Sequence, residues 1–388
     1  MEHYDIIVLG IGGVGSAVLD QLAQRGVRAV GIDRFRPPHD RGSTHGHTRV
    51  IRQAYFEHSD YVPLLIESYR LWHDLEQRIG QRLYQEVGLI EIGPADGVVV
   101  PGVLRAASEH KLSVQSLTAN EINVRWPGIH AAEDLVGVFE SRAGYLLVED
   151  CVAAHLAAAE GAGAKLLMET AVRSWSATPH EVRVQTDVGE IAAERLVITA
   201  GPWAGQLLAD LNIPLSVRRK SLFWFGTDSS EYNVAEGFPV FLFEAPVEDN
   251  TAEEQEKGTH SVFYGFPKLD DRGVKMAEHG GGRPVKDPLT VDRSIDAGEQ
   301  QRLVNVARKW LPDVSPHVTG HAVCMYTMSP DEMFIVDRHP AHANVVFAAG
   351  LSGHGFKFAP VLGRALSEMA LEGSTQLPID FLSLARLR

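Results

Sequence analysis

Three glycines and an aspartate near the start of the chain have the spacing of a dinucleotide-binding site. Gly10, Gly12 and Gly15 form a G-x-G-x-x-G pattern between the apolar run 5–9 and a helical pattern. The first glycine permits a tight turn, the second lets the backbone approach a pyrophosphate, and the third packs the helix on the strand. Asp33 follows about 20 residues later, where a carboxylate can bind a ribose diol. The pattern predicts a dinucleotide site but does not separate NAD from FAD.

Two cysteines and three neighbouring histidines are further candidates for chemistry. Cys151 and Cys324 belong to no Cys-x-x-Cys or Cys/His metal pattern. A lone cysteine is usually a buried apolar side chain, although its thiolate is a strong nucleophile. His39, His45 and His47 lie close in sequence, but imidazole ligands need partners in a fixed geometry, which this spacing does not supply. We expect no metal.

The glycine pattern needs a strand before it and a helix after it, and the sequence predicts both. Residues 5–9 are apolar and rich in β-branched side chains, as in a buried parallel strand. Residues 13–25 have apolar side chains at helical spacing and end at Gly26. Residues 28–32 form the next expected strand. Together they make a strand-helix-strand unit.

Further along, the patterns predict one sheet with helices and a second sheet of another type. Helices are expected at 60–79, 149–163 and 357–371, and a short one opened by a capping box of Thr118 and Glu121. Short apolar strands are expected at 195–199 and 345–349. Mixed or alternating patterns predict antiparallel strands at 215–226, 239–245, 261–266 and 273–278. Residues 247–260 are expected to form an exposed loop.

These elements predict an α/β plus α+β architecture in which an antiparallel-sheet substrate domain is inserted into a discontinuous Rossmann-like domain. We assign residues 1–80, 145–215 and 315–388 to the nucleotide-binding domain, and residues 81–144 and 216–314 to the substrate domain.

Composition excludes several classes of protein. The 388 residues include 45% hydrophobic and 22% charged ones, as expected of a globular protein. The net charge of −14 argues against nucleic-acid binding, which needs a basic surface. No apolar run approaches the length of a membrane span, and the first residues do not resemble a secretory signal. We therefore expect a cytoplasmic protein with no membrane or nucleic-acid partner.

Four separated motifs narrow the prediction. They read GSTHGHTRVIR at 42–52, YGFP at 264–267, CMYT at 324–327 and GLSGHGFKF at 350–358. Taken together and in order, they resemble the monomeric sarcosine oxidase and N-methyltryptophan oxidase family over nearly the whole chain. The resemblance implies FAD, bound covalently through Cys324 as a thioether to the 8-methyl group of the flavin. A thiolate is a suitable nucleophile for that carbon. Gly353 and Gly355 are expected to contact the cofactor.

The resemblance also implies roles for charged residues. Arg52 and Lys357 match the two cations that hold the substrate carboxylate, a role that suits an arginine fork and a compact ammonium. Lys275 matches the lysine beside the flavin where oxygen reacts, and its charge would stabilise superoxide. His45 and Arg49 match residues against the flavin ring. Without the motifs, Arg52, Lys357 and Lys275 would be ordinary surface or ion-pair residues.

Aromatic residues complete the expected site. Tyr264 and His279 match residues that line the substrate cavity. Tyr326 follows Cys324 by two positions, so both face one side if this segment is extended. Core packing with a satisfied hydroxyl is the alternative for both tyrosines.

Three residues depart from the family pattern. Thr44 and His47 stand where a histidine and an aspartate are common, so a titratable group replaces a fixed negative charge. Glu278, next to His279, could favour a cationic substrate side chain if it faces the cavity, or it could point to solvent.

The prediction is a monomeric flavin oxidase of N-methyl amino acids such as sarcosine or N-methyltryptophan. It would consume oxygen and release an imine, then formaldehyde and the amino acid, with hydrogen peroxide. The alternatives are an amine dehydrogenase with another electron acceptor, an oxidase of a cyclic imino acid, a flavin-binding scaffold without turnover and, least favoured, an NAD dehydrogenase.

Overall fold

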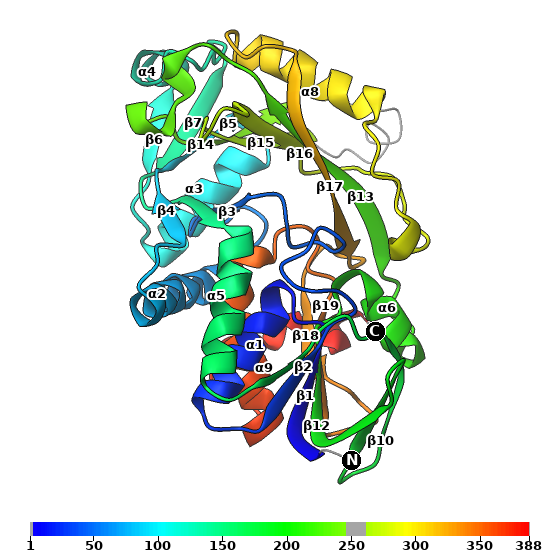
Figure 1. Cartoon of the computed structure of the whole chain (residues 1–388). Helices are drawn as coiled ribbons and strands as arrows, with labels where there is room; N and C mark the ends of the chain where they lie inside the picture. Colours follow the sequence, from blue (N-terminus) through cyan, green and yellow to red (C-terminus); the bar gives the residue numbers. More distant parts are fainter. Residues whose placement is uncertain (1–2, 246–260, 388) are drawn as a thin grey trace.

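The computed structural model describes residues 3–245 and 261–387. Its strands form three sheets in two halves, which are stacked vertically in Figure 1. The expected loop at 247–260 lies outside the described residues.

The lower half is built on a mainly parallel sheet of eight described strands. Its central strands run in the order β10-β11-β12-β1-β2-β9, and β19 adds to β12 and carries β18. These strands are β1 (His3–Leu9), β2 (Ala29–Ile32), β9 (Lys165–Leu167), β10 (Val172–Ala177), β11 (Val182–Thr186), β12 (Glu190–Ile198), β18 (Ile335–Arg338) and β19 (Val345–Ala349). The predicted strands at 5–9, 28–32, 195–199 and 345–349 are all confirmed.

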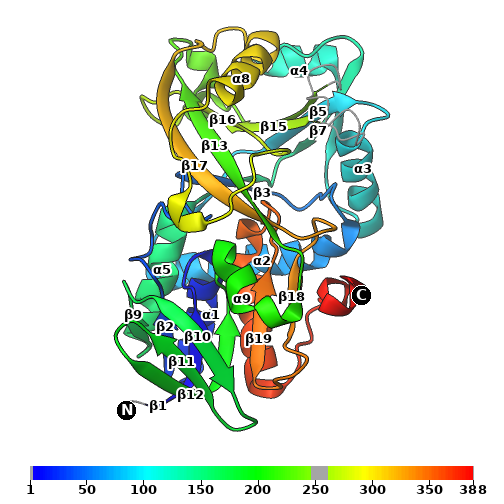
Figure 2. The ribbon, with the colours of Figure 1, turned by 90° about the vertical axis from the view of Figure 1, so that its right-hand side faces the viewer.

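The strands of this sheet carry buried apolar side chains on both faces. Helices cover one of these faces. Ile6 and Val8 of β1 pack with α1 (Gly13–Gln24), α5 (Val148–Gly161) and α9 (Ala359–Glu372), whereas Ile7 and Leu9 belong to the core on the other face. Figure 2 shows α1, α5 and α9 beside these strands. The predicted helix at 357–371 starts slightly late, because Phe356–Phe358 form a 3-10 turn before α9 begins at Ala359.

The upper half contains a second sheet in the order β17-β13-β16-β15-β14-β5-β7-β6. Its strands are β5 (Leu89–Pro94), β6 (Gln115–Thr118), β7 (Leu135–Glu140), β13 (Ser216–Phe225), β14 (Val240–Ala245), β15 (Ser261–Phe266), β16 (Val274–Glu278) and β17 (Val318–Met328). The pairing is antiparallel as expected, with one exception: β14 pairs with β5 in parallel.

The remaining elements are a small third sheet and five further helices among the described residues. A small sheet joins β3 (Thr48–Ile51), β8 (Gly144–Leu147) and β4 (Tyr84–Glu86). The other helices are α2 (Val62–Ile79), α3 (Val99–His110), α4 (Ala119–Arg125), α6 (Ala204–Leu207) and α8 (Ala297–Trp310). The capping box of Thr118 and Glu121 at the start of α4 is confirmed.

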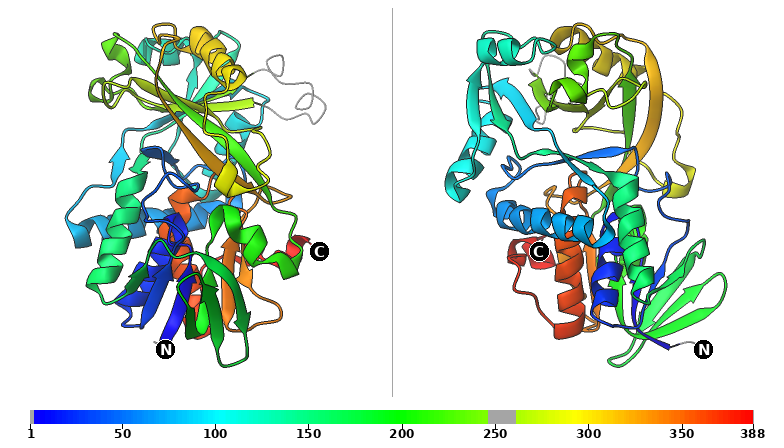
Figure 3. Two further views of the ribbon diagram at one scale, coloured as in Figure 1. Left: turned by 45° about the vertical axis from the view of Figure 1, so that its right-hand side comes forward. Right: turned by 60° about the vertical axis from the view of Figure 1, so that its left-hand side comes forward.

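Two long strands pass from the upper half toward the lower one. β13 and β17 pair along most of their length, and Figure 3 shows both reaching the first sheet. Their lower ends therefore bring residues of the second sheet to the carboxyl ends of β1, β12 and β19, where α/β sheets bind their ligands. The exact division of the chain into two domains stays a prediction. Strand β17 runs from the upper half to the lower half and so connects the two.

We expect Gly15→Ala to lower the free energy of unfolding by about 3 kcal/mol. A Cβ at Gly15 would lie 1.9 Å from the backbone oxygen of Gly10, so backbone would have to move. Urea denaturation followed by circular dichroism measures the change. Gly161→Ala at the end of α5 is the matched control, because nothing lies within 4 Å of its added Cβ. Equal stability of the two variants would contradict this packing.

Candidate functional site

The turn between β1 and α1 has the geometry of a phosphate-binding turn. Gly10 has a φ of +81°, a left-handed conformation that favours glycine. At Gly12 an added Cβ would meet only the hydroxyl of Thr44 at 3.7 Å, so the protein leaves space beside it. Helix α1 has no acidic residue or side-chain cap in its first turn. Its N-terminal N–H groups and dipole therefore favour an anion in front of them.

Asp33 lies at the end of β2, beside this turn. Its carboxylate accepts hydrogen bonds from the backbone N–H groups of Ile11 and Phe35, both at 3.0 Å. The Nε2 atom of His39 is 3.4 Å from one of its oxygens. These contacts fix the carboxylate at the edge of the cavity, where a ribose would meet it.

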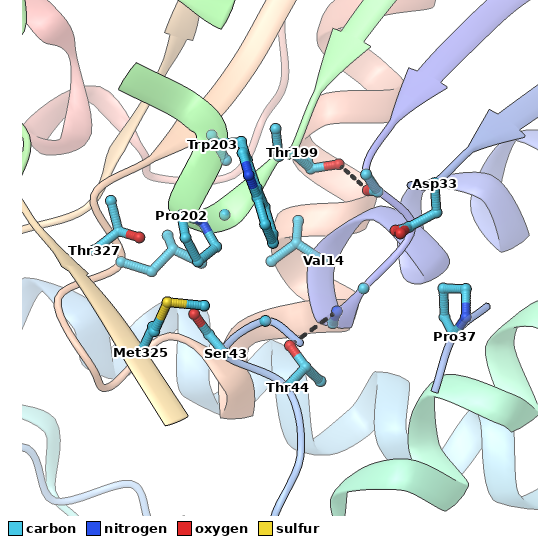
Figure 4. A pocket seen from close by; sticks show the side chains of 18 of the residues that line it. Val14, Asp33, Pro37, Ser43, Thr44, Thr199, Pro202, Trp203, Met325 and Thr327 are labelled. Atoms are coloured by element: carbon cyan, nitrogen blue, oxygen red, sulfur yellow. Dashed lines mark hydrogen bonds between the residues drawn. The ribbon is translucent and has the colours of Figure 1, made fainter. Parts of the chain in front are cut away.

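A long cavity starts at Asp33 and the glycine turn and extends to Arg49, Tyr326 and Phe356. Figure 4 shows side chains from the β1–α1 turn, the segment after β2, the segment after β12 and strand β17 around it. Two buried polar atoms that line it, Nε1 of Trp203 and Oγ1 of Thr327, have no hydrogen-bond partner among the described residues. Such atoms normally find a partner, so the cavity fits a large polar ligand.

The glycines of the late motif shape the inner end of this cavity. Gly353 has a φ of +83°, and a Cβ there would lie 2.2 Å from the ring of Tyr326. A Cβ at Gly355 would lie 2.6 Å from Leu351. Both glycines line the cavity and allow the chain to turn closely beside Tyr326. The described residues at both ends of the cavity thus fit a flavin dinucleotide.

Cys324 lies among positively charged groups. Its Sγ is 3.1 Å from Nη2 of Arg49 and 3.4 Å from Nε2 of His45. Burial opposes ionisation of the thiol, but the charges of His45, Arg49 and Lys275 outweigh it and lower the pKa of Cys324 to about 6. A thiolate is therefore present at neutral pH, as nucleophilic chemistry requires.

The second cysteine is the opposite case. Cys151 lies in α5, fully buried, and burial together with nearby acidic residues raises its pKa well above the usual value. It is an inert thiol in the core. In the described part of the chain, no group of three His, Cys, Asp or Glu side chains has an arrangement that could hold a metal ion.

Lys275 is buried on β16, close to the same cysteine. Its Nζ donates to the backbone oxygens of Gly46 and Thr48 and to the Thr48 hydroxyl, at 2.6 to 2.9 Å. These three acceptors match the three donors of an ammonium group. Burial and the charge of Arg49 nevertheless lower the pKa of Lys275 well below its ordinary value. An anion formed beside Lys275 would favour its charged form.

Arg52 is buried and already holds a carboxylate of the protein. Its Nη2 donates to both oxygens of Glu57, at 2.8 and 2.9 Å. Its guanidinium carbon lies 4.3 Å from the ring centroid of Tyr55 and 4.6 Å from that of Phe56. Despite burial, Arg52 lowers the pKa of Glu57 to about 2, so this pair stays ionised. A substrate carboxylate at Arg52 has to replace Glu57.

Lys357 is the second cation near Arg52. Its Nζ donates to the backbone oxygen of His354 at 2.8 Å and to the hydroxyl of Tyr55 at 3.3 Å. Burial and Arg52 lower its pKa to about 7, even though Glu57 opposes this shift. A bound carboxylate would raise the pKa of Lys357 and fix its charge.

Two tyrosines and two histidines connect this cation pair with Cys324. The hydroxyls of Tyr264 and Tyr326 lie 3.4 Å apart, and the ring of His279 lies 5.9 Å from that of Tyr326. His279 is in turn 6.4 Å from the ring of His354. Burial lowers the pKa of His279 to about 3 and that of His354 to about 4, so both rings are neutral. Strand β17 is extended at Cys324, as the sequence argument about Tyr326 required.

The three departures from the family pattern have defined partners. Thr44 accepts a hydrogen bond from the N–H of Gly13 at 3.3 Å, at the start of α1. His47 contacts Nη2 of Arg272 through Nδ1 at 3.0 Å, and burial and Arg272 lower its pKa. Glu278 accepts two hydrogen bonds from Arg302 of α8, at 2.9 and 3.0 Å. Its carboxylate is thus held by α8 and gives no support for a cation site at that position.

Sequence reasoning missed Glu57, Glu91, Trp203 and His354. Glu57 and Glu91 belong to none of the quoted motifs, and only the fold brings them to Arg52. His354 lies within GLSGHGFKF, so the motif could have identified it. Trp203 follows β12 in a GPW segment whose proximity to the cavity depends on the sheet order.

Comparison with known proteins now defines the class. Residues 5–369 match the model of the FAD dependent oxidoreductase family. The chain therefore belongs to this family and is an FAD-dependent oxidoreductase. No helix in the described ranges has the length and apolar character to cross a membrane.

Individual relatives narrow the class. The chain is 38% identical to a monomeric sarcosine oxidase of Bacillus sp. (strain B-0618), over 99% of this chain and 96% of the relative. It is 36% identical to the N-methyl-L-tryptophan oxidase of Yersinia pestis (strain Pestoides F), over 99% of this chain and 100% of the relative. The resemblance to the sarcosine oxidase and N-methyltryptophan oxidase family is thus confirmed.

Solved structures confirm the fold. The open form of NikD, an unusual amino acid oxidase, has a TM-score of 0.86 at 25% identity and covers 99% of this chain and 98% of its own. Glycine oxidase from Geobacillus kaustophilus has a TM-score of 0.80 at 22% identity, and the match covers 100% of this chain and 99% of the glycine oxidase chain. At that identity the second likeness concerns the fold alone.

The buried carboxyl of Glu91 predicts a pH-dependent loss of stability. Burial raises its pKa to about 8 in the folded protein, although Arg52 opposes the shift. The unfolded chain ionises at a lower pH, so wild type loses stability as the pH rises from about 5 to about 8. Glu91→Gln cannot ionise. We expect its Tm advantage over wild type to grow by about 3 °C across this range, measured by thermal scans.

Glu133→Gln, at an exposed position, is the control whose Tm difference from wild type should not change with pH. A constant difference for Glu91→Gln as well would show that Glu91 is ionised throughout.

Proposed function

We propose that this protein is a covalent flavoprotein oxidase of N-methyl amino acids. In this reaction the substrate C–N bond is oxidised to an imine, water releases formaldehyde and the amino acid, and oxygen is reduced to hydrogen peroxide. The observation that carries the proposal is the cation-activated Cys324, whose sulfur lies 3.1 Å from Arg49 of the cavity, together with the buried cations Arg52 and Lys357, the second of which directly follows Phe356 of the same cavity. The sarcosine oxidase and N-methyl-L-tryptophan oxidase relatives support the substrate class.

FAD, when bound, supplies the electron acceptor for amine oxidation and passes the electrons to oxygen. The N-terminus of α1 and the carboxylate of Asp33 hold its pyrophosphate and ribose in this proposal. Cys324 would hold FAD through a thioether to the 8-methyl group, with Arg49 and His45 keeping the sulfur ionised. This bond would replace the S–H bond and one C–H bond of the methyl group, and the two electrons released would reduce the flavin, which oxygen then reoxidises. The same cations would also stabilise negative charge on the flavin ring.

The cation pair orients the substrate. Its carboxylate takes the place of Glu57 at the Arg52 fork and accepts a further hydrogen bond from Lys357. Because His279 is neutral, no positive charge from it repels the substrate amine. The two tyrosines, Tyr264 and Tyr326, close the cavity beside the amine. Fixing the substrate in this way converts binding energy into alignment of the reacting carbon.

Lys275 serves the oxygen reaction in this proposal. The first electron transfer to oxygen creates an anion, and a buried ammonium stabilises it far more than an exposed one would.

We further propose that the enzyme works as a monomer in the cytoplasm, with the two domains divided at the boundaries expected from the sequence.

Peroxide release from sarcosine, N-methyltryptophan, proline and pipecolate tests the substrate class. The proposal expects stoichiometric peroxide and formaldehyde with at least one N-methyl amino acid. Turnover of proline or pipecolate alone would favour the cyclic imino acid alternative. Flavin-loaded enzyme that releases no peroxide with any secondary amino acid would reject the proposal.

Cys324→Ser should release the flavin on denaturation. In wild type, the yellow colour should remain with the acid-precipitated and washed protein. In the variant it should pass into the supernatant, because serine is not ionised and forms no thioether. Absorbance of pellet and supernatant measures the partition, and Cys151→Ser is the matched control that should keep its colour. Wild-type pigment that washes away freely would disprove the covalent bond.

Lys275→Met should slow reoxidation of the reduced flavin by oxygen by about 100-fold. Reduction by substrate without oxygen should change much less. Stopped-flow absorbance separates the two steps, and Lys268→Met, at a half-buried lysine of the same sheet region, is the control. Slow reoxidation of the wild type in air would instead favour a dehydrogenase with another electron acceptor.

A further inference from the structure

Glu91 is a buried carboxylate without a hydrogen-bond donor. It lies in the middle of β5 and is 1% exposed. Neither of its oxygens accepts a hydrogen bond from any residue in 3–245 or 261–387. Leaving a carboxyl group in this state is costly, and buried polar groups without a partner are rare. Retention of such a group at an interior position points to a use that requires it.

The neighbouring buried carboxylates on this face of the sheet differ from Glu91 because they accept hydrogen bonds from the backbone. Glu140 accepts hydrogen bonds from the N–H groups of Gln53 and Ala54. Glu244 accepts them from the start of α3, at Val98 and Val99. Those two carboxylates fix loops and a helix end. Glu91 performs no such structural task within the described residues.

Glu91 faces the same side of the sheet as Tyr264, which belongs to the candidate substrate site. In the register of the sheet, Leu242 of β14 is opposite Glu91 on one side and opposite Tyr264 on the other. Residues directly opposite each other point to the same face. Two strand spacings separate Glu91 from Tyr264, or about 10 Å.

Arg52 links Glu91 to the predicted carboxylate site but does not satisfy it. The Nε atom of Arg52 is 3.6 Å from the nearer oxygen of Glu91, too far for a hydrogen bond. The fork of Arg52 is directed to Glu57 instead. Glu91 is therefore the secondary ion-pair partner of Arg52, after Glu57, and its oxygens still lack hydrogen-bond donors among the described residues.

Charge balance indicates the kind of group that Glu91 can bind. Arg52 and Lys357 carry two positive charges, which Glu57 and a substrate carboxylate together compensate. Burial keeps Glu91 protonated near neutral pH as long as no positive charge compensates it, because its ionised form would add a negative charge that these groups leave unbalanced. A cationic hydrogen-bond donor on the substrate would compensate it and supply the missing donors.

We propose that Glu91 is a specificity-determining residue that binds an ammonium or guanidinium group in the side chain of the substrate. The preferred substrate is then a basic N-methyl amino acid. The inference rests on the proposed function, since it takes the carboxylate site at Arg52 and Lys357 as the anchor of the substrate.

Steady-state kinetics with a matched substrate pair tests this inference. Nα-methyl-lysine and N-methylnorleucine differ mainly in the terminal ammonium group. Wild type should prefer the lysine derivative in kcat/KM by about 10- to 100-fold, the range expected for a buried charged hydrogen bond. Glu91→Leu should remove or reverse this preference, and Glu91→Gln should weaken it. Glu278→Gln should keep it, because Arg302 already holds that carboxylate.

A ratio near one in wild type, or an equal preference in wild type and Glu91→Leu, would overturn the inference. An equal rise of KM for both substrates in Glu91→Gln would do the same, because it would show that Glu91 only supports Arg52. Thermal scans and flavin content confirm that each variant is folded.

A binding measurement separates this inference from the proposed function. Titration of the flavin absorbance of the holoenzyme with ε-aminocaproate and caproate requires no turnover. The inference expects tighter binding of ε-aminocaproate in wild type and loss of this difference in Glu91→Leu. If this difference is seen while no N-methyl amino acid is oxidised, the oxidase proposal fails and the cation site remains. Equal binding of both acids in wild type contradicts the cation site.

Discussion

Burial of positive charge at the junction of the two large sheets is the constraint on which the site depends. The chain as a whole carries a net charge of −14, yet Arg52, Lys275 and Lys357 are buried in its interior and Arg49 is half-buried near them. Charged groups are removed from water at high cost unless acceptors compensate them. Each of the four has acceptors from the protein. The fold thus maintains an electropositive interior in an acidic protein, which suits anionic ligands and a thiolate.

Local backbone geometry supplies several of these acceptors. The carbonyl groups of Gly46 and Thr48 point to Lys275, and those of Ser43 and Thr48 accept hydrogen bonds from Arg49. The segment before β3 therefore holds cations through main-chain oxygens instead of carboxylates. Neutral acceptors leave the positive charge uncancelled, and this charge lowers the pKa of Cys324. An aspartate in their place would compensate the cations and return the thiol to its protonated form.

Much of the fold follows from the sequence because local signals agree with the tertiary structure. The strand at 5–9, the glycine turn and the helix behind it are locally encoded, and the structure reproduces them. The motif at 42–52 identified His45 and Arg49, and the structure places both beside Cys324, which is far away in sequence. The parallel pairing of β14 with β5 could not be predicted, because strand order depends on long-range packing.

The polar partners of the site could not be predicted from the sequence either. Glu57 is one of many acidic residues in the sequence, and only the turn after β3 brings it to Arg52. Glu91 lies in an apolar strand, where alternation suggests an ordinary exposed position on one face. Its burial results from the pairing of β5 with both β14 and β7. The sequence directed attention to Glu278 instead, which the structure pairs with Arg302.

Ionisation of Cys324 in flavin-free protein tests the central claim most directly. The thiolate absorbs in the ultraviolet, so the difference between wild type and Cys324→Ser, followed as a function of pH, gives the pKa of this one thiol. The cation cluster predicts a midpoint at about 6, and loss of this low midpoint when Arg49 is replaced by methionine. A midpoint near 9, the ordinary value of a cysteine, would contradict the account.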